Sequence, residues 1–300
     1  MSSKPRRILA ALCLCFLLAA CGREEAAAPS PTPEPSAPIP LPIARPEAEY
    51  PSVPVYFDGL LSARGYLHNG VIFISPQPLC DYYGLELTER TEGDSAVLTI
   101  GGVELLAKLG QGYMAMDGRY LYTPEDYIIV DGHVCLPCDA AGRIFGISLT
   151  AAEDLSRADG ELTALRLLQG GEDYYATHYP QEDVYWLSRI IYAETRDQPM
   201  AGLIGVGNVV YNRLNSDDFP DTVFDVIFDR KHTVQFDPAA TGGVLGEPDE
   251  RSVIAAYLCF EGYNTVGDSL YFVNPDKGDS GWFEQALEPV ISLGDHDFYK

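Results

Sequence analysis

Glu194 is the residue whose type and position most directly suggest chemistry. Four apolar residues before it have the spacing of one helical face: Val184, Leu187, Ile190 and Ile191. On a continuing helix the Glu194 carboxylate would project on or beside this apolar stripe. Partial burial raises the pKa of a carboxyl group, as a general acid working near neutral pH requires. Spacing alone favours the alternative, a glutamate at the rim of the core that pairs with Arg196 or Arg213.

The segments after Glu194 predict the elements that position it. Residues 200–214 predict a helix whose glycines, Gly202, Gly205 and Gly207, let it pack closely beneath the helix that carries Glu194. Two further helices are expected, a short one over 221–228 and another from about Asp249 to 261. The chain then turns to strands, expected over 270–273, 289–293 and the final residues.

Six short blocks in this region follow one another in a fixed order. They are Tyr192-Ala193-Glu194-Thr195-Arg196, the block 207–213, Gln235-Phe236, the block 271–275, Trp282, and the block 294–299. Together they resemble the SleB/CwlJ-type cell wall hydrolase domain, the catalytic module of spore cortex-lytic enzymes. The resemblance covers roughly residues 183–300, and it is specific because all six blocks occur in order.

The resemblance implies an α+β fold, in which a lysozyme-like helical catalytic domain carries a small β-sheet. It also implies a lytic transglycosylase that acts on the glycan strands of peptidoglycan, with Glu194 as its essential acid. No carboxylate in a matching block other than Glu194 is a candidate for catalysis, which favours closure of a 1,6-anhydro ring over hydrolysis by paired carboxylates. A muramidase that hydrolyses the same bond remains an alternative.

The residue types suggest further substrate contacts, each with a structural alternative. Gln235 has an amide suited to an N-acetyl group, Tyr271 and Trp282 offer flat faces to sugar rings, and Asn274 could hold a hydroxyl or amide group. Phe236 is included as a substrate-binding residue. The aromatic residues could instead belong to the core, and Asn274 could serve only to shape a turn. Glu194 is expected to face an open groove lined by Gln235 and Tyr271, with both arginines pointing elsewhere.

The sequence departs from the family at two places. Asp197-Gln198 replaces the usual glycine and acidic residue, and Asp237 stands where the family often has a serine. These departures affect the expected substrate subsites and motivate a third alternative, a non-catalytic lipoprotein that binds peptidoglycan. A role in germination does not follow from the resemblance.

Composition excludes several other functions. The formal net charge is −24 and the sequence pI is about 4.4, so the chain lacks the basic surface that binds nucleic acid. No motif for a metal or phosphate site is present, and neither a metal nor another cofactor is expected.

The first twenty residues predict a secretory signal. Basic residues precede an apolar run from Ile8 to Ala20, which is shorter than a membrane span. Residues 18–22, Leu-Ala-Ala-Cys-Gly, resemble a bacterial lipobox, which implies that Cys21 is lipidated after removal of residues 1–20. An ordinary secretory signal is the alternative. Residues 21–54 are rich in proline and predict a semi-rigid tether.

Residues 55–168 contain an internal repeat of 62 residues. Asn69-Gly70 and Gly84 in the first unit correspond to Asp131-Gly132 and Gly146 in the second. The pattern resembles the copper amine oxidase N-terminal domain-like module and predicts a small β-rich α+β domain that acts as a spacer or contacts the wall. Cys135 and Cys138 have the spacing of a redox pair, but buried structural cysteines fit the repeat better.

The sequence thus predicts a membrane-anchored extracytoplasmic lipoprotein with its catalytic domain at 181–300. The expected partners are peptidoglycan glycan strands, cleaved between N-acetylmuramic acid and N-acetylglucosamine, and the lipid bilayer. A regulatory envelope protein is possible, but the sequence does not identify one.

Overall fold

The structure is a computed structural model that describes residues 50–57, 61–147, 149–151, 171, 173–231, 236–277 and 281–300. The predicted signal, Cys21 and nearly all of the proline-rich tether lie outside the described residues, as does Gln235.

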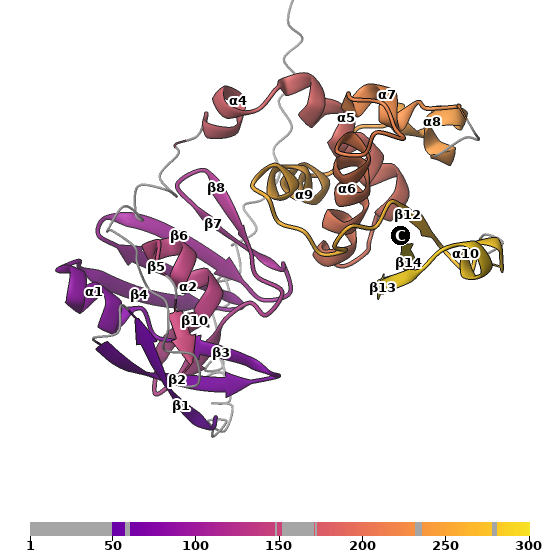
Figure 1. Ribbon diagram of the computed structural model, residues 1–300. Coiled ribbons are helices and arrows are strands. Elements are labelled where there is room, and N and C mark those ends of the chain that lie inside the picture. The colour runs from indigo at the N-terminus through magenta and orange to yellow at the C-terminus, as the bar shows by residue number, and fades with distance from the viewer. Residues whose placement is uncertain are drawn as a thin grey trace, which may run out of the picture. The chain divides into compact units, whose positions relative to one another are not determined.

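The N-terminal half is built mainly from strands, which form two antiparallel sheets (Figure 1). The six-stranded sheet has the order β11-β1-β2-β3-β10-β9, and the five-stranded sheet the order β4-β5-β6-β7-β8. The strands are β1 (Ser52–Phe57), β2 (Leu61–His68), β3 (Val71–Ile74), β4 (Leu87–Glu92), β5 (Ser95–Ile100), β6 (Val103–Lys108), β7 (Tyr113–Met116), β8 (Arg119–Tyr122), β9 (Ile128–Val130), β10 (His133–Pro137) and β11 (Leu149–Ala151). Two helices accompany them, α1 (Gln77–Tyr83) and α2 (Cys138–Phe145).

The sequence repeat corresponds to a repeated local structure. A turn with two positive φ angles precedes β3 at Asn69-Gly70 (φ 49° and 82°), and an equivalent turn precedes β10 at Asp131-Gly132 (φ 50° and 81°). The following helices α1 and α2 both end at a left-handed glycine, Gly84 and Gly146, whose backbone N–H bonds back to the helix. The glycines recur because this conformation strains a residue that has a Cβ.

The C-terminal half consists of helices and a small sheet, and the predicted α+β class is confirmed. The helices are α4 (Tyr174–His178), α5 (Gln181–Thr195), α6 (Met200–Leu214), α7 (Val223–Ile227), α8 (Asp237–Thr241), the 3₁₀ helix η1 (Gly243–Leu245), α9 (Glu250–Phe260) and α10 (Gly281–Ala286). Strands β12 (Tyr271–Val273), β13 (Pro289–Leu293) and β14 (His296–Tyr299) form an antiparallel sheet in which β14 is central.

The predicted helices agree with these bounds in most places. Residues 200–214 form α6, and Asp249 caps α9 by accepting a hydrogen bond from the Ser252 backbone N–H at 2.8 Å. The helix predicted over 221–228 is an exception, because α7 spans only Val223–Ile227. Its N-cap is Thr222, whose hydroxyl oxygen accepts a hydrogen bond from the Asp225 backbone N–H. Thr222 rather than Asp221 therefore marks its start.

Helix α6 lies at the centre of the helical core, and its glycines explain how closely its neighbours approach. A Cβ at Gly207 would lie 2.6 Å from the Cys259 Sγ on α9 and 3.1 Å from the Ile191 Cδ1 on α5. At Gly205 it would lie 2.9 Å from the Phe298 Cζ on β14. The two distances below 3.0 Å are too short for a Cβ and the 3.1 Å contact is tight, so the glycines allow α5, α9 and the sheet to pack against one helix. The predicted close packing beneath the helix with Glu194 is confirmed.

Among the described residues, no helix combines the length and apolar character needed to cross a bilayer.

Substitution of Gly207 by Ala should destabilise the protein by about 1–3 kcal/mol, because the methyl group overlaps α9 and presses on α5. Chemical denaturation followed by circular dichroism measures the loss. Gly202→Ala on the same helix is the matched control, since its nearest neighbour would lie 3.4 Å away. The control should stay within about 1 kcal/mol of the wild-type protein. Equal stability of the two variants would contradict this packing.

Candidate active site

Glu194 occupies the last turn of α5, one residue before the helix ends. The preceding turns anchor this position, because Leu187, Ile190 and Ile191 are completely buried in the helical core. Thr195 is also buried and donates its hydroxyl to the Ile191 carbonyl at 2.7 Å. Glu194 itself is only partly buried. The helix therefore holds one carboxyl group at the boundary between the core and solvent.

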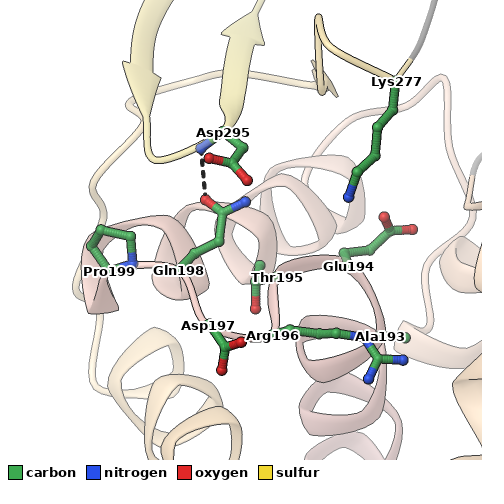
Figure 2. A pocket seen from close by; sticks show the side chains of 9 residues that line it. All are labelled: Ala193, Glu194, Thr195, Arg196, Asp197, Gln198, Pro199, Lys277 and Asp295. Atoms are coloured by element: carbon green, nitrogen blue, oxygen red, sulfur yellow. Dashed lines mark hydrogen bonds between the residues drawn. The ribbon is translucent and has the colours of Figure 1, made fainter.

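The chain turns sharply after Glu194 at Arg196, which has a φ of 44°. A positive φ is uncommon for a residue with a side chain and is costly unless the surrounding structure enforces it. The guanidinium of Arg196 lies 5.4 Å from the centre of the Tyr192 ring. In Figure 2 it points away from the Glu194 carboxylate. Arg196 thus shapes the turn without neutralising the acid, as predicted.

Gln198 ties the loop after Glu194 to two distant segments. Its Oε1 accepts a hydrogen bond from the Asp295 backbone N–H at 2.9 Å, in the turn between β13 and β14 (Figure 2). Its backbone carbonyl accepts from the Arg251 guanidinium on α9 at 2.8 Å. The turn also requires Gly294, because a Cβ there would lie 1.9 Å from Gln198 Oε1. Gln198 therefore fixes the place of Asp295 beside the loop.

An open pocket of about 310 Å³ lies in front of Glu194. It is formed by the end of α5 with its following loop, the turn after β12, and the turn between β13 and β14. Its lining residues are Ala193, Glu194, Thr195, Arg196, Asp197, Gln198, Pro199, Lys277 and Asp295. Figure 2 shows the Glu194 carboxylate and the Lys277 ammonium pointing toward each other. The acid is thus accessible and faces charged groups from three segments.

The surroundings of Glu194 favour its protonated form. Its pKa is raised from an ordinary 4.5 to about 7, mainly because burial disfavours the charged carboxylate. The Asp237 carboxylate raises this pKa further, while the Lys277 ammonium lowers it. A carboxyl group that titrates near neutral pH can both donate and accept a proton under physiological conditions.

Arg213 does not pair with Glu194, as predicted. Its Nε donates to the Leu270 carbonyl at 2.8 Å, and its guanidinium lies 4.9–5.5 Å from the ring centres of Phe219, Phe236 and Tyr271. Burial lowers the pKa of Arg213 to about 10. This cation holds aromatic side chains together within the domain.

The structure corrects the expected role of Phe236. Only 1% of Phe236 is exposed, and its ring packs against Phe272 and the Arg213 guanidinium. It is a core residue and does not offer a surface to a sugar. A place in the core is the alternative that the sequence had left open for this residue.

Three further predicted substrate contacts, Tyr271, Asn274 and Trp282, lie outside the lining of this pocket. Tyr271 is partly buried beside Arg213 and Phe219, and Trp282 is 59% exposed on α10. Asn274 Oδ1 accepts a hydrogen bond from the Asp276 backbone N–H, so Asn274 shapes a turn, the alternative that the sequence had left open. Contacts of Tyr271 and Trp282 with a glycan stay predictions.

Sequence reasoning missed Lys277, Asp295 and the influence of Asp237. Asp295 and Asp237 belong to or adjoin the ordered blocks, and Lys277 follows the 271–275 block by two residues. Their proximity to Glu194 depends on contacts between segments 40 to 100 positions apart, which spacing along the chain does not reveal.

The described residues contain no cluster of three or more His, Cys, Asp or Glu side chains suited to a metal ion. Cys135 and Cys138 are free thiols, and burial raises the pKa of each to about 12. Such thiols are poor nucleophiles at neutral pH, which favours a structural role over redox chemistry.

The fold and pocket define an α+β domain that presents a partly buried carboxyl group of raised pKa in an open pocket. Residues 197–299 match the family described as Cell Wall Hydrolase, so the C-terminal part of the chain is a cell wall hydrolase domain. The matched range begins three residues after Glu194.

Curated relatives support this assignment. The chain is 35% identical to the spore cortex-lytic enzyme of Oceanobacillus iheyensis over 122 residues. This aligned segment covers 41% of the chain and 43% of the relative. It is 36% identical over 120 residues to that of Halalkalibacterium halodurans, covering 40% of the chain and 35% of the relative. The chain thus spans less than half the length of these relatives. A solved structure, the catalytic domain of the germination-specific lytic transglycosylase SleB from Bacillus anthracis, is 31% identical and covers 41% of this chain and 98% of that one, with a TM-score of 0.38.

Replacement of Glu194 by Gln should stabilise the protein increasingly as the pH rises from 5 to 8. The folded state holds the Glu194 proton more tightly than the unfolded state does. The wild-type protein therefore loses stability as the pH rises from the pKa of Glu194 in the unfolded chain, 4.5, to its pKa in the folded protein, about 7. Gln cannot lose a proton and avoids this cost. Because water screens a partly exposed group, the gain at pH 8 should be about 1–2 kcal/mol.

Denaturant unfolding of both proteins at several pH values measures the effect. Glu182→Gln is the control, since Glu182 is exposed in the first turn of the same helix. Its effect on the free energy of unfolding should change little with pH. A gain for Glu194→Gln that does not depend on pH would contradict the raised pKa.

Proposed function

We propose that this protein is a peptidoglycan lytic transglycosylase, which cleaves the bond between N-acetylmuramic acid and N-acetylglucosamine and leaves 1,6-anhydromuramic ends. The observation that carries the proposal is Glu194, a carboxyl group with a pKa near 7 in an open pocket of a cell wall hydrolase domain. The relatives named as spore cortex-lytic enzymes support the substrate class.

The proposed reaction uses Glu194 twice. The protonated carboxyl group first donates its proton to the glycosidic oxygen, and the bond from C1 of the muramic acid to this oxygen breaks. The resulting carboxylate then accepts the proton of the muramic acid 6-hydroxyl, whose oxygen bonds to C1. A pKa near the working pH suits both steps, and the intramolecular hydroxyl replaces a protein nucleophile.

A muramidase is the second candidate, because further carboxylates lie near the acid. Asp295 lines the same pocket as Glu194, and the Asp237 charge acts on Glu194. In a hydrolase such a carboxylate would activate water or stabilise the developing positive charge on the sugar. The two candidates share Glu194 and differ in the sugar end that they produce.

The proposal also concerns the rest of the chain. Residues 1–20 would direct export, and a lipid on Cys21 would anchor the protein on the outer side of the membrane. Residues 21–54 would form the tether, and residues 55–168, the domain that resembles the copper amine oxidase N-terminal module, would act as a spacer or contact the wall. The catalytic domain, at 181–300, would then reach the glycan strands.

Digestion of purified peptidoglycan should release muropeptides with 1,6-anhydromuramic ends, each one water lighter than the corresponding reducing product. Mass analysis of the soluble fraction distinguishes the two. Glu194→Gln should lower the rate of release at least about a hundredfold, because it removes the proton donor and acceptor. Glu182→Gln should release the same products at the wild-type rate.

Three results would change the proposal. Reducing ends alone would identify a muramidase, and undiminished release by the Glu194→Gln protein would exclude Glu194 as the acid. Binding to peptidoglycan without cleavage by the wild-type protein over a broad pH range would indicate a non-catalytic module.

A further inference from the structure

Lys277 is placed in the pocket by the turn that follows β12. The Lys277 backbone N–H donates to the Asn274 carbonyl at 3.0 Å, and the Asp276 backbone N–H donates to the Asn274 side-chain oxygen at the same distance. Pro275 restricts the backbone between them. Asn274 thus closes the turn through both its carbonyl and its side chain, and the turn determines where the Lys277 side chain begins.

The Lys277 side chain extends from this turn into the pocket that contains Glu194. Figure 2 shows its ammonium directed toward the Glu194 carboxylate, with no hydrogen bond drawn between them. Lys277 is exposed, so its ammonium group can be reached from solvent. A group bound in this pocket would therefore meet the acid and the ammonium together.

Other charged groups near Glu194 do not duplicate this role. Asp237 on α8 acts on Glu194 with the opposite sign, and the carboxylates of Asp197 and Asp295 line the pocket. The guanidinium of Arg196 lies over Tyr192.

The remaining nearby cations have partners elsewhere. Arg189 pairs with Glu247, Arg213 donates to the Leu270 carbonyl, and Arg251 donates to the Gln198 carbonyl. Within the described part of the chain, Lys277 is therefore the cation directed at Glu194.

We propose that Lys277 acts on the glycan-cleaving reaction through Glu194, by stabilising the carboxylate that forms when the proton passes to the glycosidic oxygen. This role rests on the proposed function. The electrons of the broken bond leave with the N-acetylglucosamine oxygen, which takes the proton, so Glu194 becomes negative while positive charge develops at C1. The ammonium offsets the negative charge until the 6-hydroxyl proton returns to Glu194.

Lys277 and Asp237 together explain how one carboxyl group can serve as acid and then as base. Without the ammonium, burial and Asp237 would raise the pKa of Glu194 further and make release of its proton less favourable. Without Asp237, this pKa would be lower, although burial, the largest cause of the shift, would still raise it. The opposed charges keep proton donation and proton acceptance comparable in free energy.

The test compares Lys277→Met, which removes the charge at similar length, with Lys277→Arg, which keeps it. The pKa of Glu194 is measured by ¹³C NMR of the side-chain carboxyl group, assigned by its loss in Glu194→Gln. In Lys277→Met this pKa should rise by about half a pH unit or more, because a nearby positive charge has been removed. The high-pH limb of the pH–rate profile should move to higher pH by a similar amount. The value of kcat should fall about tenfold or more, with a smaller change in KM.

Lys277→Arg and two further variants make the test specific. Lys277→Arg should restore most of the wild-type pKa and rate. Asp237→Asn should move the pKa of Glu194 downward, opposite to Lys277→Met. Lys108→Met removes a partly exposed lysine that pairs with Asp94 in the N-terminal half, and it should change neither quantity.

The outcomes separate this role from the proposed function. If the wild-type protein cleaves glycan and Lys277→Met matches it in rate and in the pKa of Glu194, Lys277 has no catalytic role. If Lys277→Met loses activity but the pKa of Glu194 stays unchanged, the electrostatic role is likewise wrong. A wild-type protein that cleaves no glycan overturns the proposed function itself.

Discussion

The partial burial of one carboxyl group, Glu194, is the constraint on which the rest of the site depends. Burial disfavours its charged form and raises its pKa to about 7. This requires a helix whose other face is firmly anchored, and α5 meets the requirement through completely buried side chains that contact α6 and α9. The glycines of α6 contribute at a distance, because they allow the close packing that holds the end of α5 in place.

The pocket is assembled from segments that are far apart in the chain. The loop after α5 supplies Gln198, whose side chain fixes the β13–β14 turn through the Asp295 backbone. The turn after β12 supplies Lys277, and the start of α8 supplies Asp237, whose charges act on Glu194 with opposite signs. Hydrogen bonds such as that of Gln198 to the Asp295 backbone thus hold the segments that carry the charged side chains around Glu194. This arrangement resembles other sites in which the supporting structure, rather than the reacting group, determines protonation.

The sequence predicted the elements better than the contacts between them. Helical spacing located α5 and α6, and the Asp249 cap located α9, because these signals are local. For Phe236 the sequence could not decide between a sugar contact and the core, because burial of an aromatic ring depends on its tertiary neighbours. Lys277 was missed for the same reason, since nothing near it in the sequence refers to Glu194. The ordered blocks predicted that Glu194 is the acid, whereas its electrostatic surroundings required coordinates.

A crystal structure of the Glu194→Gln protein with a bound glycan strand fragment tests the central claim most directly. The account predicts that a glycosidic oxygen lies about 3 Å from the side-chain amide at position 194, with the muramic acid 6-hydroxyl on the same side and Lys277 lining the site. A fragment bound on another surface, with this pocket empty or closed by an ion pair to Glu194 in the wild-type protein, would contradict it.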